Sequence, residues 1–272
     1  MENKRNRNML SIFVDSFDGY SDVWDTFFLI FKHYWNDCIF PIYLVSNNLS
    51  YKDKKVKVIR TGDEIDWFTR TKRALNTIKD DYVLFMLEDY FISKKINNDD
   101  FLSIIDYMKK NDIFYYRLST SNIISKGDTY IQSVPKNQRY AISLQPAVWK
   151  RETLLNIINS IPDAKTAWDF EVYFTKIYHS NMPYDEFIPG ICYDSRDILG
   201  YKNGILQGKW IRDTIKYYKK INIKIDIGDR KKNSFINSLL YNLKANLNKK
   251  LSNKSIKNIK KILNKVGVKF FS

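Results

Sequence analysis

A run of six apolar residues in this sequence stops abruptly at two acids. Tyr82–Leu87 has the sequence YVLFML and is followed directly by Glu88 and Asp89. Such a run is typical of a strand buried on both faces, as in a mostly parallel sheet covered by helices. Open α/β sheets bind ligands outside the carboxyl ends of their strands, so the two acids stand where a ligand is expected. The alternative is that they only end a strand at the surface.

The rest of the chain predicts an alternation of strands and helices. Apolar runs indicate strands, and apolar residues at three- and four-residue spacing indicate helices. The expected strands are Met9–Val14, Ile39–Ser46, Val56–Arg60, Phe114–Ser119 and Tyr140–Trp149. The expected helices are Val23–Trp35 with Asp22 as its cap, a helix from about Asp63 to Ile78 with Asp63 as its cap, Asp99–Lys110, Arg151–Ile158 and Ala167–Tyr178.

Composition indicates a folded protein with one main domain. Of the 272 residues, 44% are hydrophobic and 15% aromatic, well above the content of a disordered chain. The two cysteines, Cys38 and Cys192, are too few for a disulfide framework, which favours the cytoplasm. The apolar run near the start is too short for a signal peptide, and no stretch approaches the roughly 18 apolar residues of a spanning helix. We expect one domain over residues 1–228 and a tail over residues 229–272.

Most of the formal charge of +15 lies in that tail. Residues 229–272 hold 12 Lys and Arg against one acid, which leaves +4 for the rest of the chain. From Phe235 onward leucines and isoleucines recur at helical spacing between the lysines, which predicts basic amphipathic helices. Such helices lie on anionic membranes, so we expect a peripheral protein at the inner face of the cell membrane. Packing against the domain and dimerisation are the alternatives, and nucleic acid is not expected as a partner.

One part of the chain resembles GT-A nucleotide-sugar glycosyltransferases. A helix with Arg73 and Asn76 leads into the strand YVLFML and then into Glu88, Asp89 and Tyr90. In that family a similar helix and strand precede an Asp-x-Asp motif that holds the donor's ribose and diphosphate, usually through Mn²⁺ or Mg²⁺. The resemblance implies that Arg73, Glu88 and Asp89 bind the donor and that the two acids are the metal ligands. Tyr90 replaces the last acid and departs from the pattern, because tyrosine is a poor ligand for hard cations.

The same resemblance implies further donor-binding residues near the start of the chain. Asp15 and Asp18 follow the first expected strand, and Asn47 follows the second. In the family the ends of these strands contact the base and the ribose, and here Phe17 or Tyr20 is suited to stack on the base. Because Asn and Asp are common in ordinary turns, each polar residue also has a purely structural interpretation.

Residues 145–171 resemble the acceptor half of the same family. In its inverting members an acid at the start of a helix is the general base, which takes the proton of the acceptor hydroxyl as the glycosidic bond forms. Asp169 and Glu171 are both candidates, and Asp169 is equally suited to cap its helix together with Thr166. Residues two apart on a helix do not share a face, so we expect only one of them in the site. The expected acceptor contacts are Gln145, Trp149 and Trp168.

A later segment supplies the last candidates. In the family a late loop closes over the donor and brings a basic residue to the diphosphate, and by position this is Lys209. The alternative is a solvent-facing lysine beside a core tryptophan, Trp210. Of the two histidines, we expect His33 to be structural, whereas His179 is a candidate for a late metal ligand.

The sequence thus predicts an α/β protein of GT-A-like (Rossmann-like) fold: a mostly parallel central sheet flanked by helices, with a basic α-helical C-terminal tail. The resemblance implies a hexosyltransferase-type glycosyltransferase, inverting, that moves a sugar from a nucleotide diphosphate donor to a hydroxyl of a lipid-linked or growing bacterial surface glycan such as capsule or lipopolysaccharide. One alternative is a non-catalytic scaffold that binds membranes or polyanions. Another is a nucleotidyltransferase on a related fold, although residues 15–19 offer acids where a Gly-rich phosphate loop is expected.

Overall fold

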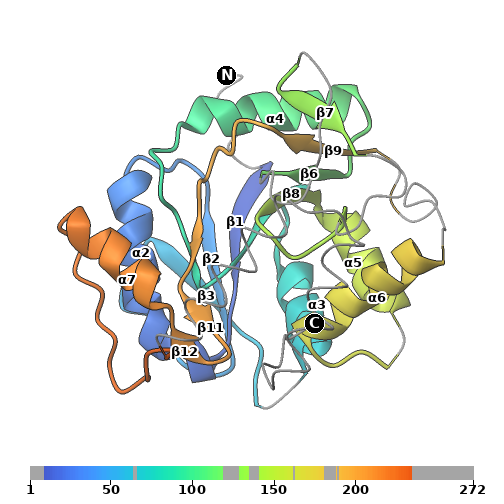
Figure 1. Cartoon of the computed structure of the whole chain (residues 1–272). Helices are drawn as coiled ribbons and strands as arrows, with labels where there is room; N and C mark the ends of the chain where they lie inside the picture. Colours follow the sequence, from blue (N-terminus) through green and yellow to red (C-terminus); the bar gives the residue numbers. More distant parts are fainter. Residues whose placement is uncertain are drawn as a thin grey trace, which may run out of the picture.

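An eight-stranded mixed sheet forms the centre of the protein, in a computed structural model that describes residues 9–63, 66–118, 129–134, 141–161, 163–180, 188 and 190–234 (Figure 1). The strand order is β3-β2-β1-β4-β8-β6-β9-β7. The first four strands are parallel, as are β6 and β9, while β8 and β7 run antiparallel to their neighbours. The strands are β1 (Leu10–Asp15), β2 (Ile42–Ser46), β3 (Val56–Arg60), β4 (Tyr82–Leu87), β6 (Tyr115–Arg117), β7 (Ile131–Ser133), β8 (Ala147–Lys150) and β9 (Ile191–Asp194).

Helices cover both faces of this sheet, which confirms the predicted α/β fold class (Figure 1). One face packs against α2 (Ser21–Tyr34), α4 (Asn98–Lys110) and α7 (Arg212–Lys220). The other packs against α3 (Trp67–Thr77), α5 (Arg151–Ser160) and α6 (Ala167–His179). Because both faces are covered, the central strands need apolar residues at every position, and this explains their unbroken hydrophobic runs.

Strand β1 shows how the two cores divide. Ile12 and Val14 belong to the core beneath α2, whereas Phe13 points to the opposite core and lies 5.7 Å from the ring of Phe85. Successive side chains of a strand alternate between the faces, so one strand supplies both cores. Each of these four residues has no exposed surface.

Two of the predicted helix caps are wrong. Asp66, not Asp63, caps α3: its carboxylate accepts the backbone N–H of Thr69 at 2.9 Å. Asp22 lies inside the first turn of α2, where its carboxylate pairs with Arg230 at 2.6 Å. No side chain caps α2, whose N-cap residue is Tyr20. Only the backbone geometry decides whether a nearby carboxylate meets the free N–H groups at the start of a helix.

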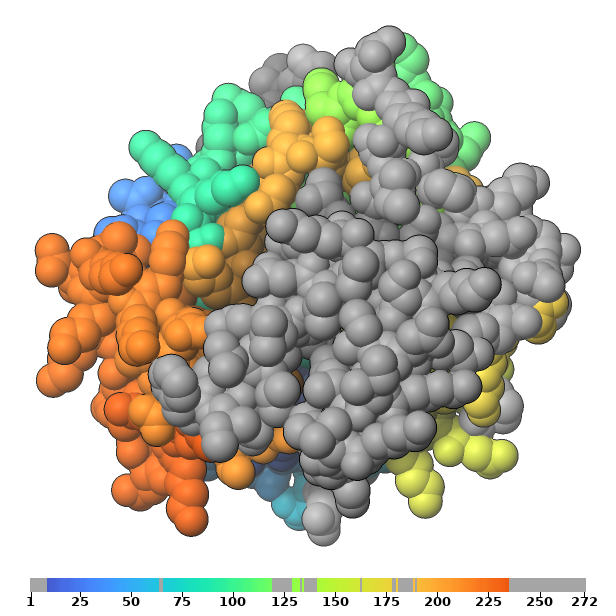
Figure 2. Space-filling model, viewed as in Figure 1, coloured from blue at the N-terminus to red at the C-terminus, as the bar shows by residue number. Residues whose placement is uncertain are grey.

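A late segment of the chain lies against the carboxyl end of β4. Strand β10 (Lys202–Asn203) pairs with β5 (Tyr90–Phe91), and β11 (Ile205–Leu206) forms a hairpin with β12 (Lys209–Trp210). The approach is close, since a Cβ on Gly204 would lie 2.5 Å from the ring of Phe91. In Figure 2 this segment and α7, coloured orange, form a continuous surface along one side of the protein.

The chain after α7 returns to the domain. The N–H of Trp210 donates to the carbonyl of Lys231 at 2.9 Å, and the N–H of Asn233 donates to the carbonyl of Trp210 at 2.9 Å. Residues 229–234, the start of the expected tail, therefore pack on the domain. The amphipathic helices expected from Phe235 onward lie outside the described residues. None of the helices in the described part of the chain has the length and hydropathy needed to cross a membrane.

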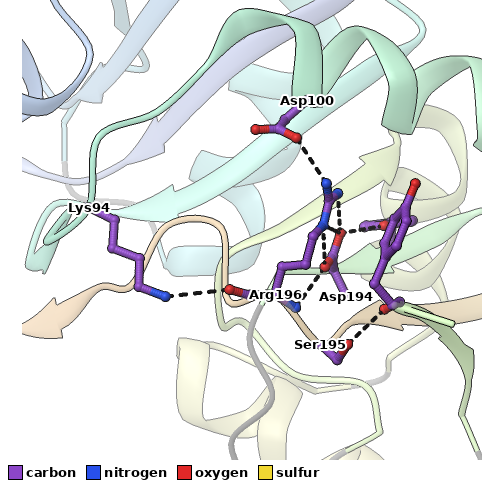
Figure 3. A network of polar contacts seen from close by, with 7 residues as sticks. Lys94, Asp100, Asp194, Ser195 and Arg196 are labelled. Atoms are coloured by element: carbon purple, nitrogen blue, oxygen red, sulfur yellow. Dashed lines mark hydrogen bonds and ion pairs between the residues drawn. The ribbon is translucent and has the colours of Figure 1, made fainter. Parts of the chain in front are cut away.

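An ion-pair network fixes the loop between β9 and β10 (Figure 3). Asp194, fully buried at the end of β9, is paired with Arg196 at 2.7 Å and accepts a hydrogen bond from the hydroxyl of Tyr116 at 2.7 Å. Arg196 also reaches Asp100 on α4 at 3.0 Å and stacks on Tyr130 at 4.1 Å. The network joins α4, β6 and β9, so it holds the start of the loop that leads to β10 in position.

Candidate functional site

The parallel pairing of β1 with β4 brings two of the predicted donor-site acids together. Asp15 is in register with Leu87, so Glu88 follows immediately beside it at the carboxyl edge of the sheet. Asp15 is 1% exposed and Glu88 is 7% exposed. Charged groups are rarely buried to this extent without a partner, and such positions are concentrated at functional sites.

Burial also governs the ionisation of these acids. It raises the pKa of Asp15 to about 6, although the charge of Arg70 and the hydrogen bond from the Thr71 hydroxyl act in the opposite direction. The pKa of Glu88 is raised well above its usual value, first by burial and then by the neighbouring Asp89 and Asp15. Among the described residues, no side chain donates a hydrogen bond to the Glu88 carboxylate.

The late segment contacts the next two residues of the motif. The backbone carbonyl of Asp89 accepts the N–H of Gly204 at 2.7 Å, and its Oδ2 accepts the N–H of Ile205 at 3.3 Å. Burial raises the pKa of Asp89 to about 6. Tyr90 pairs with Asn203 across β5 and β10, and its ring lies 4.8 Å from that of Tyr201. The motif is therefore held between the sheet and the late segment.

Arg70 belongs to this site, although sequence reasoning missed it. It lies in the first turn of α3, is 8% exposed, and its guanidinium sits 5.2 Å from the ring of Phe17. Its charge lowers the pKa of both Asp15 and Glu88. Nevertheless it forms no hydrogen bond or ion pair with any other described residue through its side chain.

Arg230 is a second missed cation, and it comes from the start of the expected tail. It pairs with Asp22 at 2.6 Å, donates to the carbonyls of Gly19 and Gly208 at 3.1 and 3.2 Å, and lies 4.4 Å from the ring of Tyr20. Its positive charge lowers the pKa of Asp89. Arg230 thus connects α2, the β11–β12 turn and the acidic motif.

Three predicted donor-binding residues have structural contacts. The Asp18 carboxylate accepts the N–H groups of Asn47 and Asn48 at 2.9 and 3.0 Å, and the Asn47 side chain accepts the N–H of Asp18 at 3.1 Å. This reciprocal pair joins the loops after β1 and β2. Arg73 donates to the carbonyl of Thr61 at 3.0 Å, beyond the end of β3. These contacts hold the loops at the carboxyl edge of the sheet together, and the role of the three residues in donor binding stays a prediction.

The two base candidates separate clearly. Asp169 lies at the surface, where Oδ2 accepts the N–H groups of Lys165 and Thr166 at 3.0 and 2.7 Å; these bonds lower its pKa. Glu171 is half-buried, and burial raises its pKa. The charge of Glu171 in turn raises the pKa of Tyr90, so this carboxylate lies within electrostatic reach of the acidic motif. Of the two candidates, Glu171 is the one whose charge acts on the motif, and its role as the base stays a prediction.

The acceptor candidates also differ in position. Trp149 has no exposed surface and packs 4.1 Å from the ring of Tyr115, so the prediction that it contacts an acceptor is wrong: it is a core residue. Trp168, at the start of α6, is 57% exposed and is free to meet a substrate. Gln145 is half-buried, and its Oε1 accepts a hydrogen bond from Arg117.

Lys209 is exposed on β12, two residues from Ile211 at the start of α7. It lies in the late segment as expected, and its contact with a diphosphate stays a prediction. His33 is exposed on α2, so it is not part of the core. The side chain of His179 lies outside the described part of the structure.

Among the residues that the structure describes, the acidic motif does not form a complete metal site built by the protein. Within the described ranges, no group of three or more His, Cys, Asp or Glu side chains is arranged to hold a metal ion. Glu88 and Asp89 are the two carboxylates at the motif, and Asp89 already accepts the N–H of Ile205. Tyr90 stands at the third position. Hard cations require several oxygen ligands, so most of the coordination would have to come from a substrate and water.

No protein-family model and no curated protein matches this sequence. Similar solved structures include TarS of S. aureus, a glycosyltransferase, with 16% identity, coverage of 91% of this chain and 44% of that one, and a TM-score of 0.45. They also include 2-C-methyl-D-erythritol 4-phosphate cytidylyltransferase of Francisella tularensis, with 14% identity, coverage of 78% and 99%, and a TM-score of 0.42. A cytidylyltransferase from Leptospira borgpetersenii has 13% identity, coverage of 62% and 71%, and a TM-score of 0.39. This chain therefore spans less than half of TarS, and likenesses at this level say nothing about activity.

Proposed function

We propose that the protein is a glycosyltransferase that uses a nucleotide diphosphate-sugar as donor. The observation that carries the proposal is the Glu88 carboxylate, which is buried at the carboxyl edge of β4 without a side-chain donor in the described part of the chain. Desolvating an acid is costly, and a fold retains such a group where a ligand makes use of it. Ribose hydroxyls supply the missing donors, so the nucleotide half of the donor fits this end of the crevice.

The acceptor half of the reaction is assigned to Glu171. Its carboxylate takes the proton of the acceptor hydroxyl while the oxygen forms a bond to the anomeric carbon of the sugar. The bond from that carbon to the diphosphate oxygen breaks, and its electron pair leaves with the nucleoside diphosphate. Attack from the side opposite the leaving group inverts the anomeric centre. Trp168 offers an exposed aromatic surface for stacking against an acceptor sugar.

We assign a bacterial surface glycan or its lipid-linked precursor as the acceptor, and a hexose as the transferred sugar. This assignment rests on the sequence resemblance and on the basic residues 235–272, which are suited to hold the enzyme at an anionic membrane. Deletion of residues 235–272 should release the protein from anionic vesicles and leave transfer to a soluble acceptor intact. Equal vesicle binding by the shortened chain would contradict the membrane assignment.

A panel of nucleotide-sugars, each tested with and without Mn²⁺ for binding and hydrolysis, tests the donor assignment. At least one nucleotide-sugar should bind, and Glu88→Gln should weaken its binding without lowering the melting temperature. The control is Glu152→Gln, a change of the same kind in the first turn of α5. If no nucleotide-sugar binds to the folded protein, the proposed function is wrong.

A further inference from the structure

Arg70 is a buried cation whose hydrogen-bonding capacity is unused. A guanidinium carries five N–H donors in a rigid fork. The side chain is 8% exposed, yet none of its donors meets another residue among those described, and Nε is wholly enclosed without a partner. A buried polar group without a partner costs free energy and requires an explanation in a folded protein.

The position of Arg70 adds a second cost. It occupies the fourth residue of α3, within the first turn, where the helix dipole already places positive charge. A cation at this end of a helix is unfavourable unless an anion joins it. Asp15 and Glu88 lie near enough to feel its field, but neither forms an ion pair with it. The charge is therefore balanced only at a distance, and its donors remain available.

The surroundings of Arg70 lead out of the protein. Its guanidinium lies 5.2 Å from the ring of Phe17, which is 36% exposed and itself lies 5.2 Å from Tyr20. Phe17 belongs to the loop after β1, at the same edge of the sheet as Glu88. The guanidinium therefore lies next to a side chain that is open to solvent, at the edge of the sheet that holds the acidic motif.

We propose that Arg70 binds the diphosphate of the nucleotide donor directly and that the donor binds without a divalent cation. This inference rests on the proposed function and refines it. A guanidinium matches the geometry of phosphate oxygens and forms short, charge-assisted hydrogen bonds with them. The motif meanwhile has Tyr90 where a third carboxylate would be, and Asp89 is hydrogen-bonded to Ile205. The positive charge that a bound metal would bring is thus supplied by the chain itself.

Calorimetric titration in EDTA tests the proposal. The full-length chain is titrated with the diphosphates of uridine, guanosine, cytidine, adenosine and thymidine, and with the five nucleosides. One diphosphate should bind in EDTA, and adding Mn²⁺ should change its affinity little. Because hydrogen bonds to charged groups contribute about 1.5–3 kcal/mol, Arg70→Ala should lower the affinity for that diphosphate by roughly 10- to 100-fold. The matching nucleoside should bind Arg70→Ala and the parent with the same affinity. An unfolded variant would not bind the nucleoside, so this result separates the loss of a contact from unfolding.

Two further variants sharpen the comparison. Arg70→Lys keeps the charge without the fork and should recover part of the lost affinity. Lys72→Ala removes an exposed cation two residues away on the same helix and should leave diphosphate binding unchanged. Melting curves establish that each variant is folded.

The contrary outcomes are distinct. Binding that appears only with Mn²⁺ would overturn the cation-independent site and leave the proposed function standing. Diphosphate binding in EDTA that Arg70→Ala does not weaken would overturn the role of Arg70. If no nucleotide binds, either with or without Mn²⁺, both the proposed function and this inference are wrong.

Discussion

The main-chain N–H of Leu144 donates a 2.8 Å hydrogen bond to Oε1 of Glu171. Leu144 lies in the segment that enters β8, and Glu171 lies in the first half of α6. The bond fixes the carboxylate from outside its own helix while leaving its second oxygen for a proton from a substrate. The bond lowers the pKa of Glu171, but burial raises that pKa by more, so the carboxylate keeps the basicity that a general base needs.

Replacing Glu171 and Asp169 separates the base from the cap. Glu171→Gln should slow transfer by roughly 10²–10⁴-fold and leave donor affinity nearly unchanged, since the lost interaction belongs to the transition state. Asp169→Asn should lower the melting temperature and leave turnover of the folded protein intact, because its carboxylate caps α6 through Lys165 and Thr166. Steady-state kinetics at saturating donor and acceptor check both. Equal turnover by Glu171→Gln and the parent would remove Glu171 from the mechanism.

The pH profile of transfer should reflect the ionisation of Glu171. Burial raises its pKa, while the Leu144 N–H and the Arg117 charge hold the rise in check; Tyr90 and Tyr115 also face it and stay neutral. A base must be deprotonated, so turnover should fall as pH falls through this raised pKa, above the value of about 4.3 for an ordinary glutamate. Arg117→Met should move this limb to higher pH, and Arg117→Lys should largely restore it.

The same shift affects stability with a defined sign. The pKa of Glu171 is higher in the folded than in the unfolded state, so its protonated form favours folding. The unfolding free energy of the parent, relative to Glu171→Gln, should therefore fall as pH rises through the raised pKa. Chemical denaturation at several pH values checks this. The turnover profile gives a separate check. If the fall of turnover at low pH occurs at the same pH in Arg117→Met as in the parent, the assignment of this pH dependence to Glu171 is wrong.

The two tryptophans of the acceptor half should respond in opposite ways. Trp149→Ala empties a space in the core and should destabilise the protein by about 3–5 kcal/mol. Trp168→Ala removes an exposed ring and should change stability by less than about 0.5 kcal/mol. If Trp168 stacks on the acceptor, its loss should raise the acceptor KM. Denaturant titration combined with kinetics of the folded fraction measures both effects, and an unchanged KM for Trp168→Ala would argue against an acceptor contact.

The network around Asp194 should stabilise the loop that leads to β10. Asp194 is fully buried, so Arg196→Ala leaves a buried carboxylate short of its main partner and should cost roughly 1–3 kcal/mol. The matched control is Lys94→Ala, whose pair with Asp197 is solvent-exposed on both sides and should contribute about 0–1 kcal/mol. Equal losses from the two changes would mean that the burial of Asp194 does not decide the stability of this loop.

Local patterns predict the sheet and the acids at its edge. The unbroken apolar run of Tyr82–Leu87 is enough to identify β4, and the abrupt change at Glu88 marks the end of the strand. The same reasoning cannot distinguish Trp149 from Trp168, because both stand beside polar residues and only packing buries one of them. Nor does it place Asp66 as the cap of α3 among several acids.

The two arginines of the site show a further limit. Arg70 lies in a helical turn with no recognisable motif around it. Only the tertiary structure places it near Phe17 and Asp15 at the end of β1. Arg230 is separated from Asp22 by 208 positions, and it reaches the site only because the chain after α7 packs back on the domain. In sequence it is one basic residue among many in a cationic segment. Signals of this kind depend on tertiary contacts, which no short-range pattern contains.

Product analysis distinguishes a glycosyltransferase from a nucleotidyltransferase. The protein is incubated in one reaction with a panel of nucleotide-sugars and in a second with nucleoside triphosphates and sugar 1-phosphates. A glycosyltransferase breaks the bond between the sugar and the diphosphate, so the first reaction should release a nucleoside diphosphate, and Glu88→Gln should reduce that release. The second reaction should yield no pyrophosphate. Release of pyrophosphate with formation of a nucleotide-sugar would contradict the account and identify the protein as a nucleotidyltransferase.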